Sequence, residues 1–256
     1  MSRLRARCPE CRTLTAVAIG PEYECHVCGR TFAAGLVRVP RAWGEEGEAM
    51  VEAAGLPLPY PEAAVVDEDT LGEQILSVAA ELPERPVVLG GCCCAHVGAV
   101  EGIASRVGRL AVVWLDAHGD LNTPETSPSG NPWGMPLRMT LDSGAVAPGD
   151  VALVGARDLD PPEEDYVARV GIHRDDAEAA VAGADAVYVA LDCDVFREEE
   201  LRSFMPAPGG MAVDEVERLF SDLAGRTRIA GAGISGLRPD PRNVAPLTRL
   251  LGALGL

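Results

Sequence analysis

The chain carries three side chains of metal-binding types at alternate positions, directly after an apolar run. Residues 116–120 read Asp-Ala-His-Gly-Asp and follow the apolar run Leu110–Leu115. Side chains two residues apart on an extended backbone point to the same side. We therefore expect Asp116, His118 and Asp120 to lie together where a buried strand ends.

A second apolar run ends in the same manner. Ala186–Leu191 is followed by Asp192-Cys193-Asp194. Two strands that both end in carboxylates predict one site at the carboxyl edge of a sheet. Oxygen ligands with some imidazole suit Mn²⁺-like metals that activate a water molecule. The alternative interpretation is that these aspartates are solvated strand ends that cap the following turns.

The elements that would hold this site alternate between strand and helix from Pro86 onward, which indicates a mostly parallel sheet with helices on both faces. The expected strands are Val87–Leu89, Leu110–Leu115, Val151–Gly155, Ala186–Leu191 and Arg228–Ile234. The expected helices are Ala95–Val107, Glu163–Val170, Asp175–Ala182, Val213–Ala224 and Val244–Leu254. Upstream we expect a helix over Glu45–Ala54, a helix capped by Thr70 and Glu73, and a less clear first strand over Leu36–Val39.

Composition narrows the class of protein. The 256 residues are 47% hydrophobic, enough for one substantial core plus a small appendage. The net charge of −17 disfavours nucleic acid and anionic membranes as partners. No apolar run approaches the ~20 residues that span a bilayer, and the N-terminus lacks the apolar segment of a signal peptide. We expect a cytoplasmic protein with a small-molecule ligand.

The first 38 residues predict a separate zinc ribbon. Cys8, Cys11, Cys25 and Cys28 form two CxxC pairs that can close a tetrahedral zinc site. So short a segment could hardly fold without the metal. Its net charge is +3 and that of the remainder is −20, so it could dock on the body or on a partner subunit. We therefore expect a ribbon over residues 1–38 and an α/β domain over residues 39–256.

Several motifs in order resemble those of the ureohydrolase (arginase/agmatinase) family. Residues 116–124 and 129–136 resemble DAHxDxNTP and SGNxHGxP, without a gap. Leu89-Gly90-Gly91, followed by three cysteines, resembles LGGDHS, while residues 191–194 resemble FDVD and residues 155–161 resemble GxRDxDP. The resemblance covers about residues 86–256, and the ordered set is highly specific.

The resemblance implies a three-layer αβα arginase-like fold, assembled as a trimer or hexamer. It also implies two divalent metals, expected to be manganese, that help hydrolyse a guanidino, amidino, ureido or formimino C–N bond. The positions that match metal ligands are Asp116, His118, Asp120, Asp192 and Asp194, of which Asp120 also handles the proton of the nucleophile. The substrate-binding positions are Asn122, Ser129, Asn131 and Asp160.

Three positions depart from the family pattern. Cys93 stands where the family has a metal-binding His, and a thiolate ligand would favour Zn or Fe over Mn. Cys93 could instead pack the turn or act as a nucleophile, and His96, one turn on, could replace it as a ligand. Trp133 replaces a His that shuttles protons, and Gly236 replaces a Glu that binds guanidinium.

These departures point to a substrate whose amino-acid-like end binds Asn122, Ser129, Asn131 and Asp160. Its reacting end would be smaller or less cationic than guanidinium and would lie against Trp133 and Gly236. Two alternatives stay open. One is an amide hydrolase with a single metal on the same scaffold, and the other is a binding or regulatory protein without catalysis.

Overall fold

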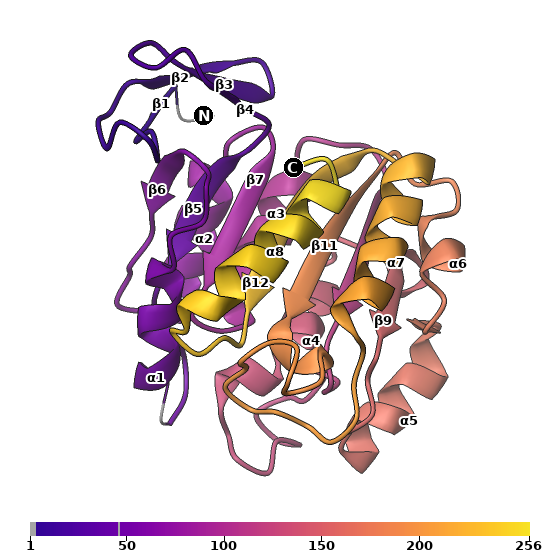
Figure 1. Ribbon diagram of the computed structural model, residues 1–256. Coiled ribbons are helices and arrows are strands. Elements are labelled where there is room, and N and C mark those ends of the chain that lie inside the picture. The colour runs from indigo at the N-terminus through magenta and orange to yellow at the C-terminus, as the bar shows by residue number, and fades with distance from the viewer. Residues whose placement is uncertain (1–3, 46) are drawn as a thin grey trace.

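The computed structural model describes residues 4–45 and 47–256, which form two separate sheets (Figure 1). The small N-terminal sheet is antiparallel, in the order β1-β2-β3-β4. Its strands are β1 (Arg5–Ala6), β2 (Ala16–Ile19), β3 (Glu22–Cys25) and β4 (Thr31–Phe32).

The larger sheet is parallel throughout, in the order β10-β9-β8-β11-β12-β7-β5-β6. Its strands are β5 (Gly35–Val39), β6 (Glu62–Val65), β7 (Pro86–Gly90), β8 (Leu110–Leu115), β9 (Val151–Val154), β10 (His173–Arg174), β11 (Ala186–Asp192) and β12 (Ile229–Ser235).

Helices cover both faces of the larger sheet and give three layers (Figure 1). One apolar cluster joins a face of the sheet to α2 (Leu71–Glu81), α3 (Cys94–Ala104), α4 (Pro136–Asp142) and α5 (Pro161–Val170). A second cluster joins the other face to α6 (Ala177–Val181), α7 (Val213–Arg226) and α8 (Val244–Ala253). The predicted three-layer αβα arrangement is therefore confirmed.

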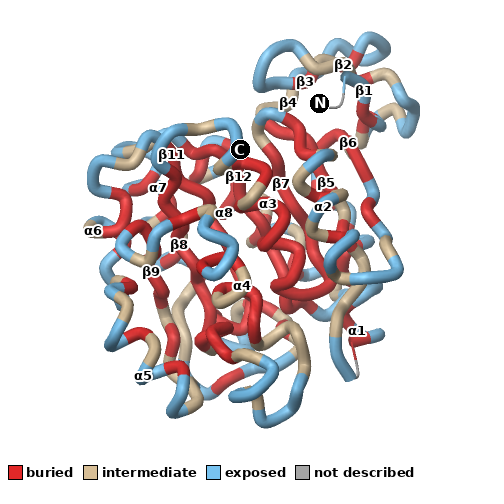
Figure 2. The backbone as a smooth tube through the Cα atoms, turned by 180° about the vertical axis from the view of Figure 1, so that it is seen from behind, coloured by how far each residue is buried: buried red, intermediate tan, exposed pale blue. Residues whose placement is uncertain are grey.

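The central strands are buried on both faces, and Figure 2 shows them as a continuous buried block. Every residue of β8, β11 and β12 is buried. This explains why their sequences are unbroken apolar runs rather than alternating ones. It also means that polar side chains can begin only where these strands end.

The predicted elements upstream of Pro86 are correct in kind but not in every boundary. The strand expected over Leu36–Val39 is β5. The helix expected over Glu45–Ala54 is shorter: α1 spans Glu48–Val51 and a 3₁₀ turn follows, while residue 46 lies outside the described residues. The short strands β6 and β10 lie at the two edges of the sheet and were not predicted, because neither forms a long apolar run.

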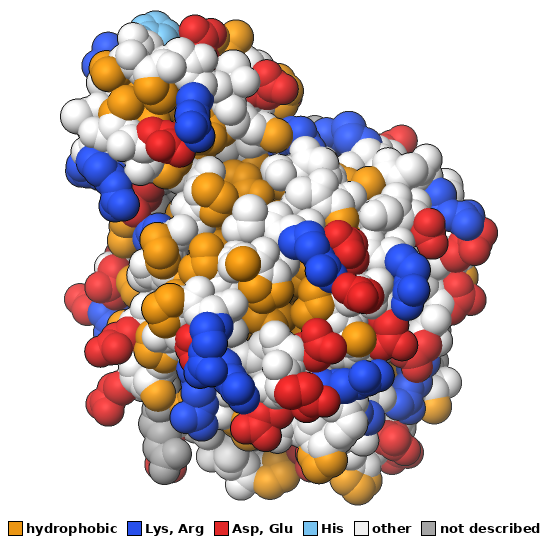
Figure 3. Space-filling view, viewed as in Figure 1, with side chains coloured by type: hydrophobic (Ala, Val, Ile, Leu, Met, Phe, Trp, Pro, Cys, Tyr) orange, Lys and Arg blue, Asp and Glu red, His pale blue; other side chains and the backbone are white. Residues whose placement is uncertain are grey.

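The small sheet lies against one edge of the large one, and the space-filling view shows it as a lobe that projects from the body (Figure 3). The backbone N–H and C=O groups of Arg7 and Glu62 pair at 2.8 and 2.9 Å, so the lobe extends edge strand β6. Residues 35–38 of the predicted ribbon range belong to β5 and pair with β7. The antiparallel sheet itself ends at Phe32.

None of the helices within residues 4–45 and 47–256 has the length and apolar character needed to cross a membrane.

Candidate functional site

The segments that follow five neighbouring strands, β7, β12, β11, β8 and β9, line a cavity of about 310 Å³. Parallel strands bring their carboxyl ends to one edge of a sheet, so residues far apart in sequence meet there. The lining includes every predicted metal-binding residue: Cys93, Asp116, His118, Asp120, Asp192 and Asp194.

The first predicted triplet converges, but not through an extended backbone. The chain bends at Ala117 and His118, and the backbone N–H of His118 donates to Asp116 Oδ1 at 2.7 Å. Asp120 then adopts a left-handed conformation, with φ of 52°. The prediction that an extended backbone places these side chains on one side is therefore wrong. A capped turn, not a continued strand, brings them together.

The second motif turns in the same way. The backbone N–H of Asp194 donates to Asp192 Oδ1 at 2.9 Å. Asp194 then reaches across to the first motif: its Oδ1 accepts from the backbone N–H of Ala117 at 2.9 Å, and its Oδ2 lies 2.9 Å from His118 Nδ1. The two aspartate motifs thus form one connected site.

Two groups of ligand atoms share Asp116. The first contains Cys93, Asp116 and Asp192, and the second contains Asp116, His118 and Asp194; within each group the ligand atoms lie within 4.8 Å of one another. The Sγ of Cys93 lies 2.8 Å from Asp192 Oδ2. His96 belongs to neither group and lies behind Cys93, fully buried.

Asp120 supplies the observation that best indicates a bound cation. Its Oδ2 is buried and has no hydrogen-bond partner within residues 4–45 and 47–256. A buried carboxylate oxygen without a partner is costly, and a metal ion would satisfy it. Asp120 is also a non-glycine residue at positive φ, a conformation that concentrates at functional sites.

The pKa values of the site residues also indicate a place for a cation. Burial, reinforced by repulsion from neighbouring carboxylates, raises the pKa of Asp192 to about 7 and that of Asp194 to about 6. The same causes raise the pKa of Asp116 and Asp120. Burial opposes the protonation of His118, but hydrogen bonds to Asp116 and Asp194 outweigh it and raise its pKa to about 12. Such a concentration of buried negative charge is what a divalent cation would relieve.

The residues predicted to bind substrate fall at two different places. Asn122, Ser129, Asp160 and Trp133 line the cavity. Asn122 donates to Asp160 Oδ2 at 2.8 Å, so these two side chains form a pair. Asn131 does not line the cavity; its Oδ1 instead accepts from the backbone N–H of Glu45 at 2.9 Å and holds the 43–45 loop.

One wall of the cavity is apolar. The rings of Trp133 and Phe204 meet edge to face with centroids 6.0 Å apart, and Met50 and Met205 also line the cavity. Gly236 completes this side at φ of 66°, and a Cβ there would collide with the carboxylate of Asp192. The position therefore has no room for any side chain while Asp192 keeps its place.

Some lining residues were missed by the sequence analysis. Phe204 and Met205 lie in a loop without a motif, so no local signal marks them. Asp158 lines the cavity and belongs to a motif that had been noticed. Glu163, interpreted as a helix start, both caps α5 and lines the cavity: its two carboxylate oxygens accept from the backbone N–H groups of Leu121 and Asp160, each at 2.8 Å.

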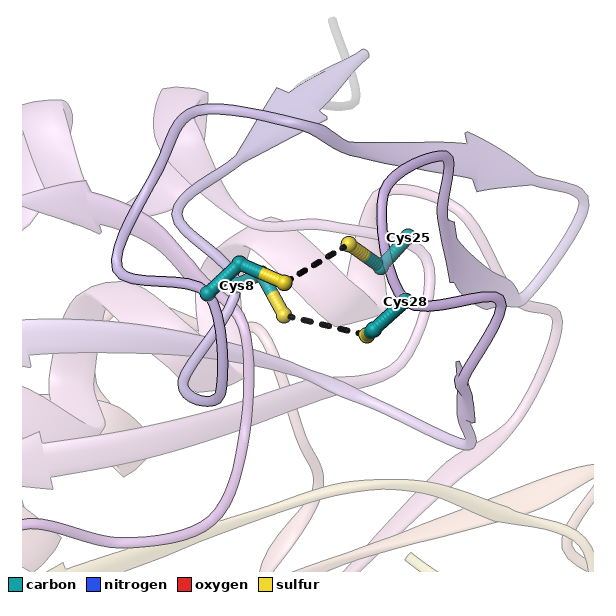
Figure 4. Close-up of side chains that lie close together, drawn as sticks. Cys8, Cys25 and Cys28 are labelled. Atoms are coloured by element: carbon teal, nitrogen blue, oxygen red, sulfur yellow. Dashed lines mark hydrogen bonds between the residues drawn. The ribbon is translucent and has the colours of Figure 1, made fainter.

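The four cysteines of the N-terminal lobe also converge. Figure 4 shows Cys8, Cys25 and Cys28 facing one another, and the Cys8–Cys28 and Cys11–Cys25 sulfur pairs are each 3.9 Å apart. Tetrahedral sulfur ligands about 2.3 Å from zinc lie about 3.8 Å from each other. The donor set and its spacing thus fit a tetrahedral zinc ion.

Comparison with known proteins places the body of the chain in a family. The sequence model of the arginase family matches residues 53–254. The arginase of Bacillus caldovelox is 33% identical over 218 residues, which cover 71% of this chain and 73% of that protein. The arginase of Staphylococcus aureus strain COL is 39% identical over 113 residues, which cover 40% of this chain but only 37% of that protein's length.

Solved structures agree on the fold. Bacillus subtilis arginase superposes with a TM-score of 0.74 at 23% identity, covering 86% of this chain and 97% of that one. Formimidoylglutamase from Bacillus subtilis superposes with a TM-score of 0.68 at 19% identity, covering 87% of this chain and 86% of that one. The ordered motifs, the shared parallel sheet and the match over residues 53–254 show that the chain belongs to the arginase family.

Proposed function

We propose that this protein is a metal-dependent hydrolase of the ureohydrolase type. It would cleave a non-peptide C–N bond in a small guanidino, amidino, ureido or formimino compound. The observation that carries the proposal is the pair of ligand groups that share Asp116 at the carboxyl ends of β7, β8 and β11. Membership of the arginase family supports it.

Two divalent cations fit the site. Cys93, Asp116 and Asp192 would hold one, and Asp116, His118 and Asp194 would hold the other, with Asp120 as a further ligand from the same cavity. Bound there, they would supply Lewis acidity and lower the pKa of water. Manganese is the expected metal from the oxygen ligands, and Cys93 favours zinc or iron.

The chain's own residues would do the remaining work. With one carboxylate oxygen on the metal, Asp120 would use its other oxygen to take a proton from the attacking water and pass it to the leaving nitrogen. The Trp133–Phe204 wall would keep bulk water from the reacting carbon. Ser129 and the Asn122–Asp160 pair offer hydroxyl, amide and carboxylate groups to an amino-acid-like end of the substrate.

The reacting end of the substrate is proposed to be smaller or less cationic than a guanidinium group. Gly236 leaves no carboxylate opposite the metal ligands at that position, and the neighbouring wall is apolar. An aromatic face can hold a cation, so a formimino or amidino group, which is smaller than a guanidino group, is compatible with a place against Trp133. Asn131 would act on this end only indirectly, through the 43–45 loop.

The N-terminal lobe is proposed to hold one structural zinc on Cys8, Cys11, Cys25 and Cys28. The sulfur spacing of 3.9 Å supports this. All eight cysteines are free thiols, which supports a reducing, cytoplasmic setting. A homo-oligomer, a trimer or a hexamer, is proposed on family resemblance alone.

The test is elemental analysis of the full chain followed by a substrate screen. We expect three metals per chain, of which a Cys8→Ser/Cys11→Ser variant loses one zinc and retains two in the body. We expect release of ammonia or urea from at least one compound of the four classes. Asp116→Asn should abolish this release, because Asp116 belongs to both ligand groups.

Two other results would replace the proposal. A single body metal, with turnover of an amide, would favour the single-metal amide hydrolase. Full metal occupancy without turnover of any C–N substrate would favour the binding or regulatory protein.

A further inference from the structure

A chain of buried polar side chains lies behind Cys93 and is not explained by the proposed reaction. It consists of Tyr188 on β11, His96 on α3 and Ser235 at the end of β12, and each of them is fully buried. Burying three polar groups costs free energy unless each finds a partner. Their arrangement therefore needs a physical reason.

The contacts run in sequence from Tyr188 to Cys93. The hydroxyl of Tyr188 lies 3.1 Å from His96 Nδ1, and His96 Nε2 lies 3.0 Å from Ser235 Oγ. Ser235 Oγ lies 3.1 Å from the Sγ of Cys93 and 3.5 Å from Asp192 Oδ2. This series of hydrogen-bonded side chains thus ends on Cys93 and Asp192, two of the residues proposed to bind metal.

The direction of donation along this chain follows from its first member. Within residues 4–45 and 47–256, His96 Nδ1 is the one hydrogen-bond partner of the Tyr188 hydroxyl. A buried hydroxyl proton needs an acceptor, so Tyr188 donates to Nδ1. Because Nδ1 accepts this hydrogen bond, the ring carries its one proton on Nε2.

The remaining hydrogen bonds continue this direction toward Cys93. His96 Nε2–H donates to Ser235 Oγ, which leaves the Ser235 proton free to point away from the ring. The thiol of Cys93 already donates to Asp192 at 2.8 Å. Ser235 has two acceptors in reach, the sulfur of Cys93 at 3.1 Å and Asp192 Oδ2 at 3.5 Å, and the sulfur is the nearer. Ser235 remains a donor when that sulfur is a thiolate.

The fold keeps space for this arrangement. Gly233 on β12 lies beside the pair, and a Cβ there would collide with both the Tyr188 hydroxyl and the His96 ring. Trp114 packs edge-on against His96 with centroids 5.3 Å apart, and its indole N–H donates to Asp116 Oδ2 at 3.1 Å. The surrounding strands thus fix the ring from more than one side.

We infer that Tyr188, His96 and Ser235 are positioning residues that deliver a hydroxyl donor to the Cys93 thiolate and so adapt this metal subsite to a sulfur ligand. The inference rests on the proposed metal centre. A donor to a ligand sulfur stabilises its lone pairs and orients it, which tunes the metal that it holds.

The test uses cobalt as a spectroscopic probe of the full chain. Cobalt bound by a thiolate gives a sulfur-to-cobalt charge-transfer band, and the ribbon cysteines also contribute one. Subtracting the spectrum of Cys93→Ser removes the ribbon contribution, because the ribbon is unchanged in that variant. The remaining band should be present in the wild-type protein.

We expect Ser235→Ala to move this difference band to longer wavelength and to weaken cobalt binding about 10- to 100-fold. Tyr188→Phe should shift it in the same direction. Without the tyrosine proton, His96 can carry its own proton on Nδ1 and accept from Ser235, which then turns away from the sulfur. Tyr60→Phe is the matched control, since that buried hydroxyl bonds the Leu256 carbonyl instead, at 3.2 Å, and should leave the band in place.

The amount of cobalt bound per chain distinguishes failure of this inference from failure of the proposed function. Body cobalt without a difference band would mean that Cys93 is not a ligand, and would overturn the inference alone. A shift in Ser235→Ala but not in Tyr188→Phe would overturn the directed chain. No body cobalt at all, by elemental analysis, would overturn the metal centre and the inference together.

Discussion

At the scale of single residues, Gly236 restricts what can occupy one side of the pocket. It occupies a left-handed backbone conformation, and the space beside it is filled by the carboxylate of Asp192. The departure from the family pattern is therefore not a simple truncation of a glutamate. The backbone and Asp192 are arranged so that no side chain fits.

This arrangement predicts a specific effect of Gly236→Ala. The left-handed conformation costs about 1–2 kcal/mol for an alanine, and the collision with Asp192 adds about 1–3 kcal/mol of overpacking. Displacing Asp192 should also weaken body metal binding. Urea unfolding and elemental analysis of the purified variant would measure both effects.

Gly144→Ala serves as the matched control. Gly144 has φ of 75° and nothing within 4 Å of its added Cβ, so this variant carries only the backbone cost. Equal losses of stability in the two variants, with metal content unchanged, would show that the contact with Asp192 has no consequence.

At the scale of elements, the N-terminus of α5 is tied to the metal-binding loop. Glu163 is 3% exposed, and its carboxylate accepts from the backbone of Asp160 on its own helix and of Leu121 beside Asp120. One side chain therefore caps a helix and fixes the loop that carries a proposed ligand. This double role was not apparent from sequence spacing, which marked Glu163 only as a helix start.

We expect Glu163→Ala to be strongly destabilising. The buried N–H of Leu121 costs about 1–3 kcal/mol when it is left without an acceptor, and the part-buried N–H of Asp160 adds a smaller cost. Glu164→Ala, one residue on, should cost no more than about 1 kcal/mol, because Glu164 is exposed and its ion pair with Arg174 is 3.7 Å long. Urea denaturation of both variants tests this, and a similar midpoint for the two would contradict it.

The contact between the N-terminal sheet and β6 would make the order of β6 depend on the proposed zinc. Ala63 of β6 belongs to the apolar cluster of the lobe, and Glu62 pairs with Arg7 through both backbone groups. Loss of the metal should unfold the lobe and leave β6 as an open edge, which is a known route to association between sheets.

Hydrogen exchange of the Cys8→Ser/Cys11→Ser variant measures this dependence. We expect peptides that contain Glu62–Val65 to lose protection, while those that contain β10 at the opposite edge keep theirs. Unchanged protection at β6 would mean that the lobe folds and docks without its zinc.

At the scale of the whole molecule, the sequence was sufficient to predict the central strands and the position of the site. Long buried strands and ordered motifs determine both. The unbroken apolar runs of β8 and β11 marked the central strands, and the aspartates after them marked the site. Short edge strands such as β10 were not predicted, because a strand of two residues shows no periodic pattern of apolar side chains. The place of Phe204 in the cavity lining and that of Asn131 outside it were not predicted. Long-range packing, not local spacing, decides which loops reach the cavity.

The buried carboxylates should also give the metal-depleted protein an unusual dependence of stability on pH. The pKa of Asp192 rises to about 7 and that of Asp194 to about 6 on folding, from an ordinary value of 3.8. Between about pH 4 and pH 7 the folded chain thus holds protons that the unfolded chain has released. Stability from these groups is present at the acid end and declines as the pH rises through this window.

Asp192→Asn isolates this effect, since it removes one of the repelling charges. In chelator-treated protein we expect the variant to match the wild type near pH 4 and to be more stable, by an amount on the order of a few kcal/mol, at pH 7. With metal restored the order should reverse, because the variant has lost a ligand. Urea midpoints across this pH range, with and without added Mn²⁺, measure both arms. The prediction would be wrong if metal-depleted Asp192→Asn were less stable than metal-depleted wild type at pH 7. That result would mean that the charge of Asp192 does not destabilise the folded protein.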